Sequence, residues 1–286
     1  MTLQSKASPL AHLNFQRLKP HPALRELVQC YWHIQVNDNH HSSESTSKIQ
    51  TDYFHPEGGS GIIFNFSNSI KVNNQLVSND VFISGPTLIT HNLQTTNDIN
   101  TLGIRFYPGS ASTFYSQPLS ELVEQLLQPD ELSIKGIGKD LYEQLAESKS
   151  LQKRINLLDH TLLSILKNSQ PVSLRVRTAV RHINSSRGKI EIASLSELLN
   201  LSQRQLDRDF KHHLGLVPKQ YSMIKRLEFA RNLIKNNPCN MNLTEIALES
   251  GFYDQAHFTR QFKQVIGITP SLYQKKSKCM AESTIK

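Results

Sequence analysis

The sequence has little of what disulfide-rich, metal-binding or membrane-spanning proteins need. It holds 3 cysteines and 1 tryptophan in 286 residues, and aromatic residues make up only 7% of it. Cys30, Cys239 and Cys279 are odd in number and far apart, so they form neither a disulfide framework nor a metal-binding spacing. No apolar run approaches the roughly 20 residues that cross a bilayer, and residues 1–6 contain no apolar signal core. We therefore expect a cytoplasmic protein that does not enter the membrane.

Positive charge is concentrated towards the C-terminus. The formal net charge is +8. Residues 1–173 contain 13 Lys and Arg against 15 Asp and Glu, whereas residues 174–276 contain 17 against 8. This difference indicates that only residues 174–276 bind a polyanion such as nucleic acid. Many basic domains, however, bind no polyanion and owe only their solubility to the charge.

An internal repeat lies within the basic segment. Matched residues 52 positions apart are Phe210 and Phe262, Lys211 and Lys263, Gly215 and Gly267, and Pro218 and Pro270. Further upstream the offset is 51, where Leu195 matches Ile246 and Asn200 matches Gly251. Two copies are too few for a solenoid, so the repeat is a duplicated motif.

The second copy, residues 243–266, has the pattern of a helix-turn-helix unit. Asn242 and Glu245 have the spacing of a capping box at the start of a helix. Gly251 is suited to the left-handed conformation that follows a helix end. Asp254 then caps a second helix, whose apolar residues recur at helical spacing.

The first copy, residues 192–214, repeats this pattern. Asn200 stands where Gly251 does, and asparagine is the next most tolerant residue for a left-handed conformation. Ser202 caps the second helix. Between the copies, residues 218 to about 236 are expected to form one long helix.

The exposed face of each second helix carries side chains suited to DNA. In the first copy the candidates are Gln203, Arg204, Asp207, Arg208 and Lys211. In the second they are Asp254, Gln255, Ala256, His257, Thr259, Arg260 and Lys263. Arg can bond a guanine edge, Gln an adenine edge, and small apolar groups can meet a thymine methyl. Exposed helices often carry such residues, but here they lie on the second helices of a duplicated unit in a basic segment.

These motifs resemble the AraC/XylS-type transcription regulators. Residues 243–273, LTEIALESGFYDQAHFTRQFKQVIGITPSLY, are similar to the family signature nearly throughout, and residues 201–221, LSQRQLDRDFKHHLGLVPKQY, to its upstream half. The first copy departs at Ser196, where Ala is common, and at Asn200, where Gly is common. The resemblance implies seven helices in two subdomains. It also implies that two recognition helices of one monomer enter successive major grooves of double-stranded DNA, about 34 Å apart. Arg177 or Arg181 would add phosphate contacts.

The chain is expected to be an α+β protein with two domains. Residues 1–170 form a strand-rich domain with helices, for which a cupin-like core is the candidate. Residues 171–277 form the all-helical domain, and residues 278–286 a tail. Residues 70–77 are expected to form a hairpin around Asn73 and Asn74, and residues 40–48 a loop.

Two helical patterns follow the predicted strands. Leu119, Leu122, Val123 and Leu126 share one face of an expected helix. Residues 151–165 carry apolar side chains at heptad spacing, which fits either a dimer-forming helix or an amphipathic helix packed on its own domain.

The function of the front domain stays open between alternatives. The resemblance implies either that this domain senses a small-molecule effector, or that it only holds two copies of the chain together as a homodimer and senses no ligand. It also implies a contact with RNA polymerase if the protein activates transcription. Trp32, Phe54, Phe64 and Phe106 are candidates for either an effector pocket or the core. The histidines lack a metal-binding spacing, so we expect neither a metal nor a cofactor. A DNA-tethered enzyme would need a reactive centre, and the cysteines offer no setting for one.

Overall fold

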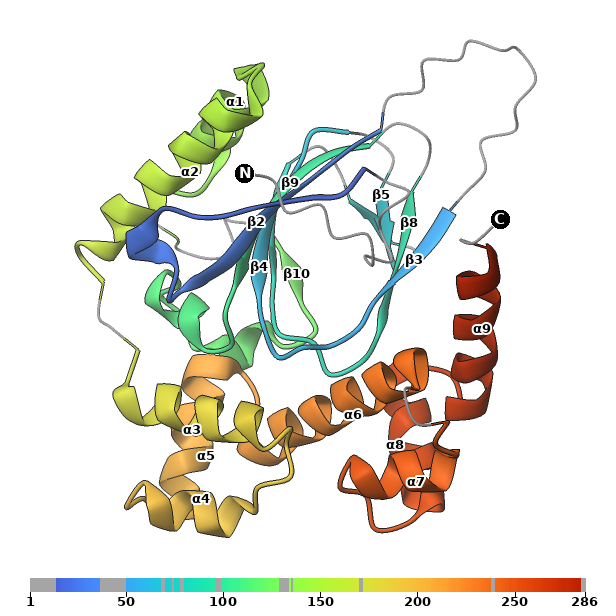
Figure 1. Ribbon diagram of the computed structural model, residues 1–286. Coiled ribbons are helices and arrows are strands. Elements are labelled where there is room, and N and C mark those ends of the chain that lie inside the picture. Colours follow the sequence, from blue (N-terminus) through green and yellow to red (C-terminus); the bar gives the residue numbers. More distant parts are fainter. Residues whose placement is uncertain are drawn as a thin grey trace.

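The computed structural model describes residues 14–36, 50–67, 70–73, 75–77, 80–95, 99–128, 134, 136–169, 172–237 and 240–283. The expected loop at residues 40–48, together with Asn74 and Cys239, lies outside these ranges. The chain has the expected α+β fold, with a strand-rich front half above a helical back half (Figure 1). No helix in the described ranges is both long and apolar enough to cross a membrane.

Two antiparallel sheets make up the front half. The larger has the order β1 (Gln16–Leu18), β2 (Val28–Val36), β9 (Ile99–Phe106), β4 (Gly61–Asn65), β7 (Val81–Ser84) and β10 (Leu126–Leu127). The smaller has the order β3 (Gln50–Phe54), β8 (His91–Thr95), β5 (Ile70–Val72) and β6 (Gln75–Val77). Strands β5 and β6 pair as the predicted hairpin, with Ile70 opposite Val77.

The larger sheet is buried on both faces, which explains why its strands are more continuously apolar than half-exposed strands would be. One face meets the smaller sheet in a core that includes Ile34 and Phe82 from one sheet and Ile70 and Leu93 from the other. The opposite face is covered by helices α1 (Lys139–Glu147) and α2 (Leu151–Leu166).

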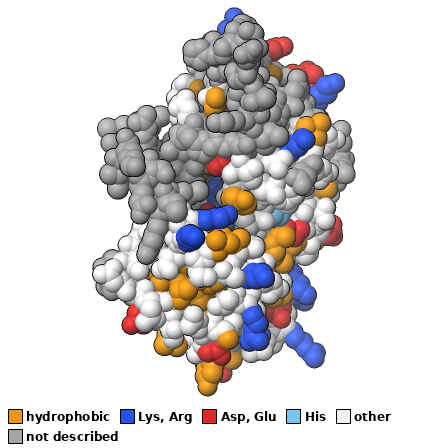
Figure 2. All heavy atoms as spheres, turned by 90° about the vertical axis from the view of Figure 1, so that its right-hand side faces the viewer, with side chains coloured by type: hydrophobic (Ala, Val, Ile, Leu, Met, Phe, Trp, Pro, Cys, Tyr) orange, Lys and Arg blue, Asp and Glu red, His pale blue; other side chains and the backbone are white. Residues whose placement is uncertain are grey.

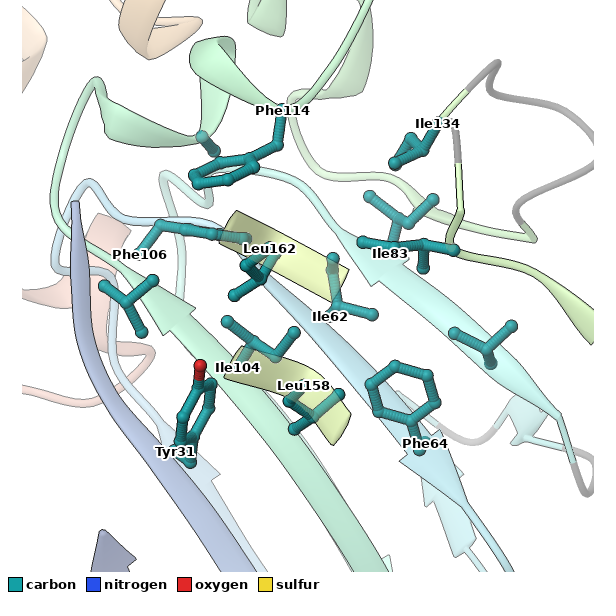
Figure 3. Close-up of a cluster of buried hydrophobic side chains, with 14 of the residues drawn as sticks. Tyr31, Ile62, Phe64, Ile83, Ile104, Phe106, Phe114, Ile134, Leu158 and Leu162 are labelled. Carbon is teal, nitrogen blue, oxygen red and sulfur yellow. The ribbon is translucent and has the colours of Figure 1, made fainter. Parts of the chain in front are cut away.

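The heptad-spaced seam of α2 packs within its own domain. Leu158 and Leu162 are 0% exposed and lie over Ile62, Phe64 and other side chains of the larger sheet (Figure 3). The Tyr31 hydroxyl also donates a hydrogen bond to Asp159 Oδ1 at 2.7 Å, which ties α2 to β2. Of the two alternatives for this seam, the structure supports the helix packed on its own domain.

The predicted helical face from Leu119 to Leu126 is wrong. Only a short 3-10 helix forms, over Leu119–Leu122. It cannot continue, because Glu124 has a left-handed φ of +61° that a right-handed helix does not accommodate. Leu126 then pairs with Ser84 in β10, at the edge of the larger sheet. A partner distant in sequence therefore overrides the local helical spacing.

Seven α-helices occupy the described part of the chain beyond residue 172. They are α3 (Leu174–Ser185), α4 (Ile192–Leu198), α5 (Gln203–Leu214), α6 (Pro218–Asn236), α7 (Leu243–Glu249), α8 (Gln255–Ile266) and α9 (Pro270–Ser283). They enclose two separate hydrophobic cores, one around Leu206 and Phe210 and one around Phe258 and Phe262. Helix α6 contributes to both cores and joins them (Figure 1).

Candidate nucleic-acid interface

The second helix-turn-helix unit, α7 and α8, forms through the local signals that its sequence carries. Asn242 Oδ1 accepts the Glu245 amide at 3.0 Å, and the Asn242 amide donates to Glu245 Oε2 at 2.7 Å, which completes the capping box. Asp254 Oδ1 accepts the His257 amide at 2.6 Å and so caps α8. The Asp254 cap fixes where α8 begins, and hence which side chains its first turns present.

The first unit, α4 and α5, has the same geometry. Ser202 Oγ accepts the Gln205 amide at 3.2 Å. Asn200 adopts a φ of +52°, where the equivalent Gly251 adopts +80°. Asparagine therefore meets the same backbone requirement as glycine at this turn, and Ser196 fits into the packed turn with its hydroxyl bonded to the Ile192 carbonyl at 2.9 Å.

Most of the predicted DNA-binding residues are exposed on α5 and α8. The exposed residues are Gln203, Arg204, Arg208, Lys211, Asp254, Gln255, Ala256, Arg260 and Lys263. The half-buried residues are Asp207, His257 and Thr259. Each helix buries its opposite face in its own core, so the two candidate sets form two separate exposed faces.

Some candidates already have partners within the protein. Asp254 caps its helix, and Gln255 Oε1 accepts a hydrogen bond from the Thr244 hydroxyl at 2.7 Å. Arg177, a candidate phosphate contact, forms an ion pair with Glu26 of the front domain. Arg208 Nε lies 3.8 Å from Asp209 Oδ1. Arg208 and Arg260 are both exposed on the outer faces of their helices and can donate two parallel hydrogen bonds.

Sequence reasoning missed Tyr253, which is 90% exposed in the turn before α8. A large aromatic side chain so exposed beside a recognition helix is available to contact a DNA backbone or base. The signal was present in the repeat, because the offset changes from 51 to 52 residues at this turn and marks an inserted residue.

Arg226, on the middle of α6, links the two units and was also missed. Its Nε donates to the Gly188 carbonyl at 2.6 Å, in the turn between α3 and α4. Its Nη1 donates to the Gly251 carbonyl at 3.1 Å, in the turn between α7 and α8. One guanidinium therefore spans the two units beside the helix that joins them, and Lys189 adds an ion pair to Glu249 at 3.2 Å.

The front domain packs against both units. At the end of α5, His213 Nδ1 and Ser112 Oγ are 2.8 Å apart. At the end of α8, the Val265 carbonyl accepts the Thr90 amide at 2.8 Å and the Thr90 hydroxyl at 3.0 Å. Helices α5 and α8 thus present their polar faces outward, while their C-terminal ends contact the front domain.

A cavity of about 360 Å³ lies between the two sheets and reaches α6. Its apolar wall includes Trp32, Phe54, Ile70 and Phe82. Two of the aromatic residues considered from sequence, Trp32 and Phe54, therefore line the cavity. The other two, Phe64 and Phe106, are buried in the core between the larger sheet and its helices.

Basic side chains gather along this cavity. Among its described lining residues, Arg17 and Arg105 come from the front domain and Arg231 and Lys235 from α6, whereas Glu57 is the one carboxylate and pairs with Arg105. Basic side chains lie beside a hollow on the corresponding face of the molecule (Figure 2). The wall is apolar and its charge is positive, which suits a ligand with an apolar body and an anionic group.

His55 lies where the cavity meets the helical domain. Burial, with Arg231 and Lys235 nearby, lowers the pKa of His55 to about 3, so the ring is neutral at physiological pH. Its Nδ1 is 2.8 Å from Thr90 Oγ1. Because the single Thr90 hydroxyl proton goes to the Val265 carbonyl, His55 Nδ1 carries a proton and donates it to Thr90. Across the described residues, no three His, Cys, Asp or Glu side chains converge to hold a metal ion.

Two family models match separate parts of the chain. Residues 195–276 match the model of a helix-turn-helix domain, and residues 16–128 match that of a domain of unknown function.

Curated relatives match part of the chain. The chain is 36% identical over 86 residues to the probable transcriptional regulator LumQ of Photobacterium leiognathi, covering 30% of this chain and 34% of that protein. It is 33% identical over 94 residues to the XylDLEGF operon transcriptional activator 2 of Pseudomonas putida, covering 32% and 60%. The chain spans about a third of the length of the first relatives that it matches.

A solved structure is also similar to the chain. ToxT of Vibrio cholerae is 16% identical, with a TM-score of 0.44, over 80% of this chain and 95% of that one. The matched helix-turn-helix domain, its two capped units and its relatives among transcriptional regulators lead to one conclusion: residues 195–276 form a helix-turn-helix domain similar to those of the AraC/XylS-type transcriptional regulators.

Proposed function

We propose that the protein is a sequence-specific DNA-binding transcription regulator. The observation that carries this proposal is the pair of exposed polar and basic faces on α5 and α8, each on the second helix of a capped helix-turn-helix unit. The assigned roles are base contacts for Arg208 and Arg260 and phosphate contacts for Lys211 and Lys263. The remaining candidates on the two faces complete these reading surfaces.

Selection from random duplex DNA tests this proposal. The full chain should enrich a motif of two half-sites about one helical turn apart, because its two units would meet successive major grooves on one side of the duplex. Binding should weaken steeply as salt is raised, since phosphate contacts release counterions. Failure to enrich any sequence at physiological salt would contradict sequence-specific binding.

The cavity supports an effector-responsive regulator over one whose front domain only dimerises. A front domain used for dimerisation alone has no need of a cavity that reaches the DNA-binding domain. Here Arg17 and Arg105 line it from the front domain while Arg231 and Lys235 line it from α6, so a bound molecule would touch both domains. The effector we propose is a small amphipathic anion, with its apolar body between the sheets.

Thermal unfolding with a matched ligand pair tests the effector class. Dodecanoate and dodecanol share a chain length and differ in charge. A ligand that binds only the folded protein raises its melting temperature, so dodecanoate should raise it and dodecanol should not. The effect of dodecanoate should weaken in Arg231→Gln and Lys235→Gln and persist in Lys219→Gln, an exposed position on the same helix. Equal stabilisation by both ligands would contradict an anionic effector.

Several expectations from the sequence stay predictions. They are the homodimer, the contact with RNA polymerase, the cytoplasmic location and the domain boundaries at residues 170 and 277. We propose that the protein acts by binding rather than by catalysis, since the arrangements described above are suited to holding DNA and a ligand.

A further inference from the structure

Both recognition helices end against the front domain. The last carbonyls of a helix have no partner within it, and at the end of α8 the Val265 carbonyl is satisfied by Thr90. At the end of α5, Gly215 is packed so closely that a Cβ there would lie 2.6 Å from the Leu119 carbonyl oxygen and 3.0 Å from Pro86 Cγ. The orientation of each helix therefore depends on front-domain atoms at its C-terminal end.

Residues 85–91, which run from the end of β7 to the first residue of β8, reach both helix ends and are called here the coupling segment. Pro86 lies beside the end of α5, Leu88 packs on the hydrophobic core of the first unit, and Thr90 bonds the end of α8. Other residues of the same segment line the cavity, namely Gly85, Thr87 and His91. One short stretch of chain thus faces the cavity on one side and both helix-turn-helix units on the other.

Glu124 holds the coupling segment in place. Its Oε1 accepts the amides of Leu88 and, at 3.1 Å, Ile89, and its Oε2 lies 2.5 Å from His91 Nε2. Its own amide donates to the Pro86 carbonyl at 3.0 Å. Glu124 does this with a φ of +61°, a conformation that non-glycine residues rarely adopt and that often occurs in switch regions.

A second chain of contacts runs from the cavity to α8. His55 lines the cavity and donates to Thr90, which donates to the Val265 carbonyl. The His55 ring also meets the Tyr273 ring of α9 edge-on, with centroids 6.1 Å apart. A displacement of this cavity wall would therefore reach the second unit directly.

We propose that the coupling segment transmits occupancy of the cavity to both recognition helices at once, and that Glu124 is the positioning residue that makes this transmission possible. The inference rests on the proposed function, because it takes the cavity as the effector site and α5 and α8 as the reading helices. A ligand that favours one position of the segment shifts both helices together and so changes affinity for a two-part DNA site.

Hydrogen exchange of the full chain without ligand or DNA tests the link. Glu124→Gly removes the side-chain acceptors but tolerates the positive φ. Amides at residues 214–216 and 265–268 should then exchange roughly threefold faster or more. Glu124→Gln, which keeps an acceptor oxygen, should restore part of the protection, and Glu121→Gln, at a nearby exposed carboxylate, should change nothing. Wild-type exchange at both helix ends in Glu124→Gly would overturn the proposal.

If Glu124→Gly does not fold, Thr90→Val provides a second variant for the same hydrogen-exchange measurement. Valine preserves the shape of threonine without its hydroxyl, so exchange should rise at the end of α8 and not at the end of α5. Unchanged exchange at α8 in that variant would equally overturn the proposal.

DNA-binding titrations with dodecanoate distinguish a failure of transmission through the coupling segment from a failure of the proposed function. In the wild type it should change affinity for the selected DNA at least about threefold, and in Glu124→Gly it should bind without that change. Binding of dodecanoate that leaves wild-type DNA affinity unaltered would overturn the link while leaving DNA recognition intact. Absence of dodecanoate binding would contradict the proposed effector class. The hydrogen-exchange measurements alone would then test whether the coupling segment connects the cavity wall to the two helices.

Discussion

Arg260 lies on the exposed face of α8, three residues before Lys263. An arginine so placed can form two parallel hydrogen bonds to a guanine edge. Arg260→Ala should weaken binding to the selected DNA by about 1–3 kcal/mol and relax the preference at one base pair. Binding titrations on the selected site and on its single-base variants would measure both effects. Gln264→Ala, on an exposed position of the same helix, is the control, and unchanged affinity in Arg260→Ala would remove Arg260 from the reading face.

His55 makes folding stability depend on pH. Its pKa is lowered to about 3 by burial and by Arg231 and Lys235, whereas an unfolded histidine titrates near 6.5. Between these values the unfolded chain binds a proton that the folded chain refuses, so this contribution to stability is complete above pH 6.5 and declines as the pH falls towards 3. His55→Gln should therefore flatten the loss of stability between pH 7 and pH 5 in urea unfolding. Identical slopes in both proteins would contradict the assigned cause.

Helix α6 joins the two helical cores, and among the described residues no other helix contributes to both. Arg226 braces this junction through the carbonyls of Gly188 and Gly251. Arg226→Lys keeps the charge but cannot form the forked pair of bonds. It should weaken binding to a two-part site by about 1–2 kcal/mol, with little change on a single half-site. A loss of equal size on both DNAs would indicate that the brace has no role in spacing the two units.

Helix α2 stabilises the front domain through its buried seam. Leu158→Ala should lower the free energy of unfolding by about 2–5 kcal/mol, because Leu158 is 0% exposed and its removal leaves a cavity. Asn156→Ala, on the exposed face, should have little effect. Denaturant unfolding would measure both. A near-neutral Leu158→Ala would mean that the seam is not part of this core.

The elements of the helical half could be predicted because their signals are local. The capping box at Asn242, the turn residues Asn200 and Gly251, and the start of α6 at Pro218 each act within a few residues, and each element is where the sequence indicated. The heptad spacing of α2 was less informative, because periodicity indicates a buried face without saying what buries it.

The whole molecule could not be assembled from such signals. Pairing of Leu126 with Ser84 replaced a locally plausible helix by a strand, and the contact of Thr90 with Val265 joins residues 175 positions apart. The cavity arises in the same way, since its basic residues come from β1, β9 and α6. Such contacts depend on tertiary packing, which a single sequence does not reveal.

We propose that one chain reads two successive major grooves with α5 and α8. Hydroxyl-radical footprinting of the full chain on its selected DNA tests this directly. We expect two protected windows about 10–10.5 base pairs apart on one face of the duplex. Arg208→Ala should weaken one window and Arg260→Ala the other. A single window, or two windows on opposite faces of the duplex, would contradict it.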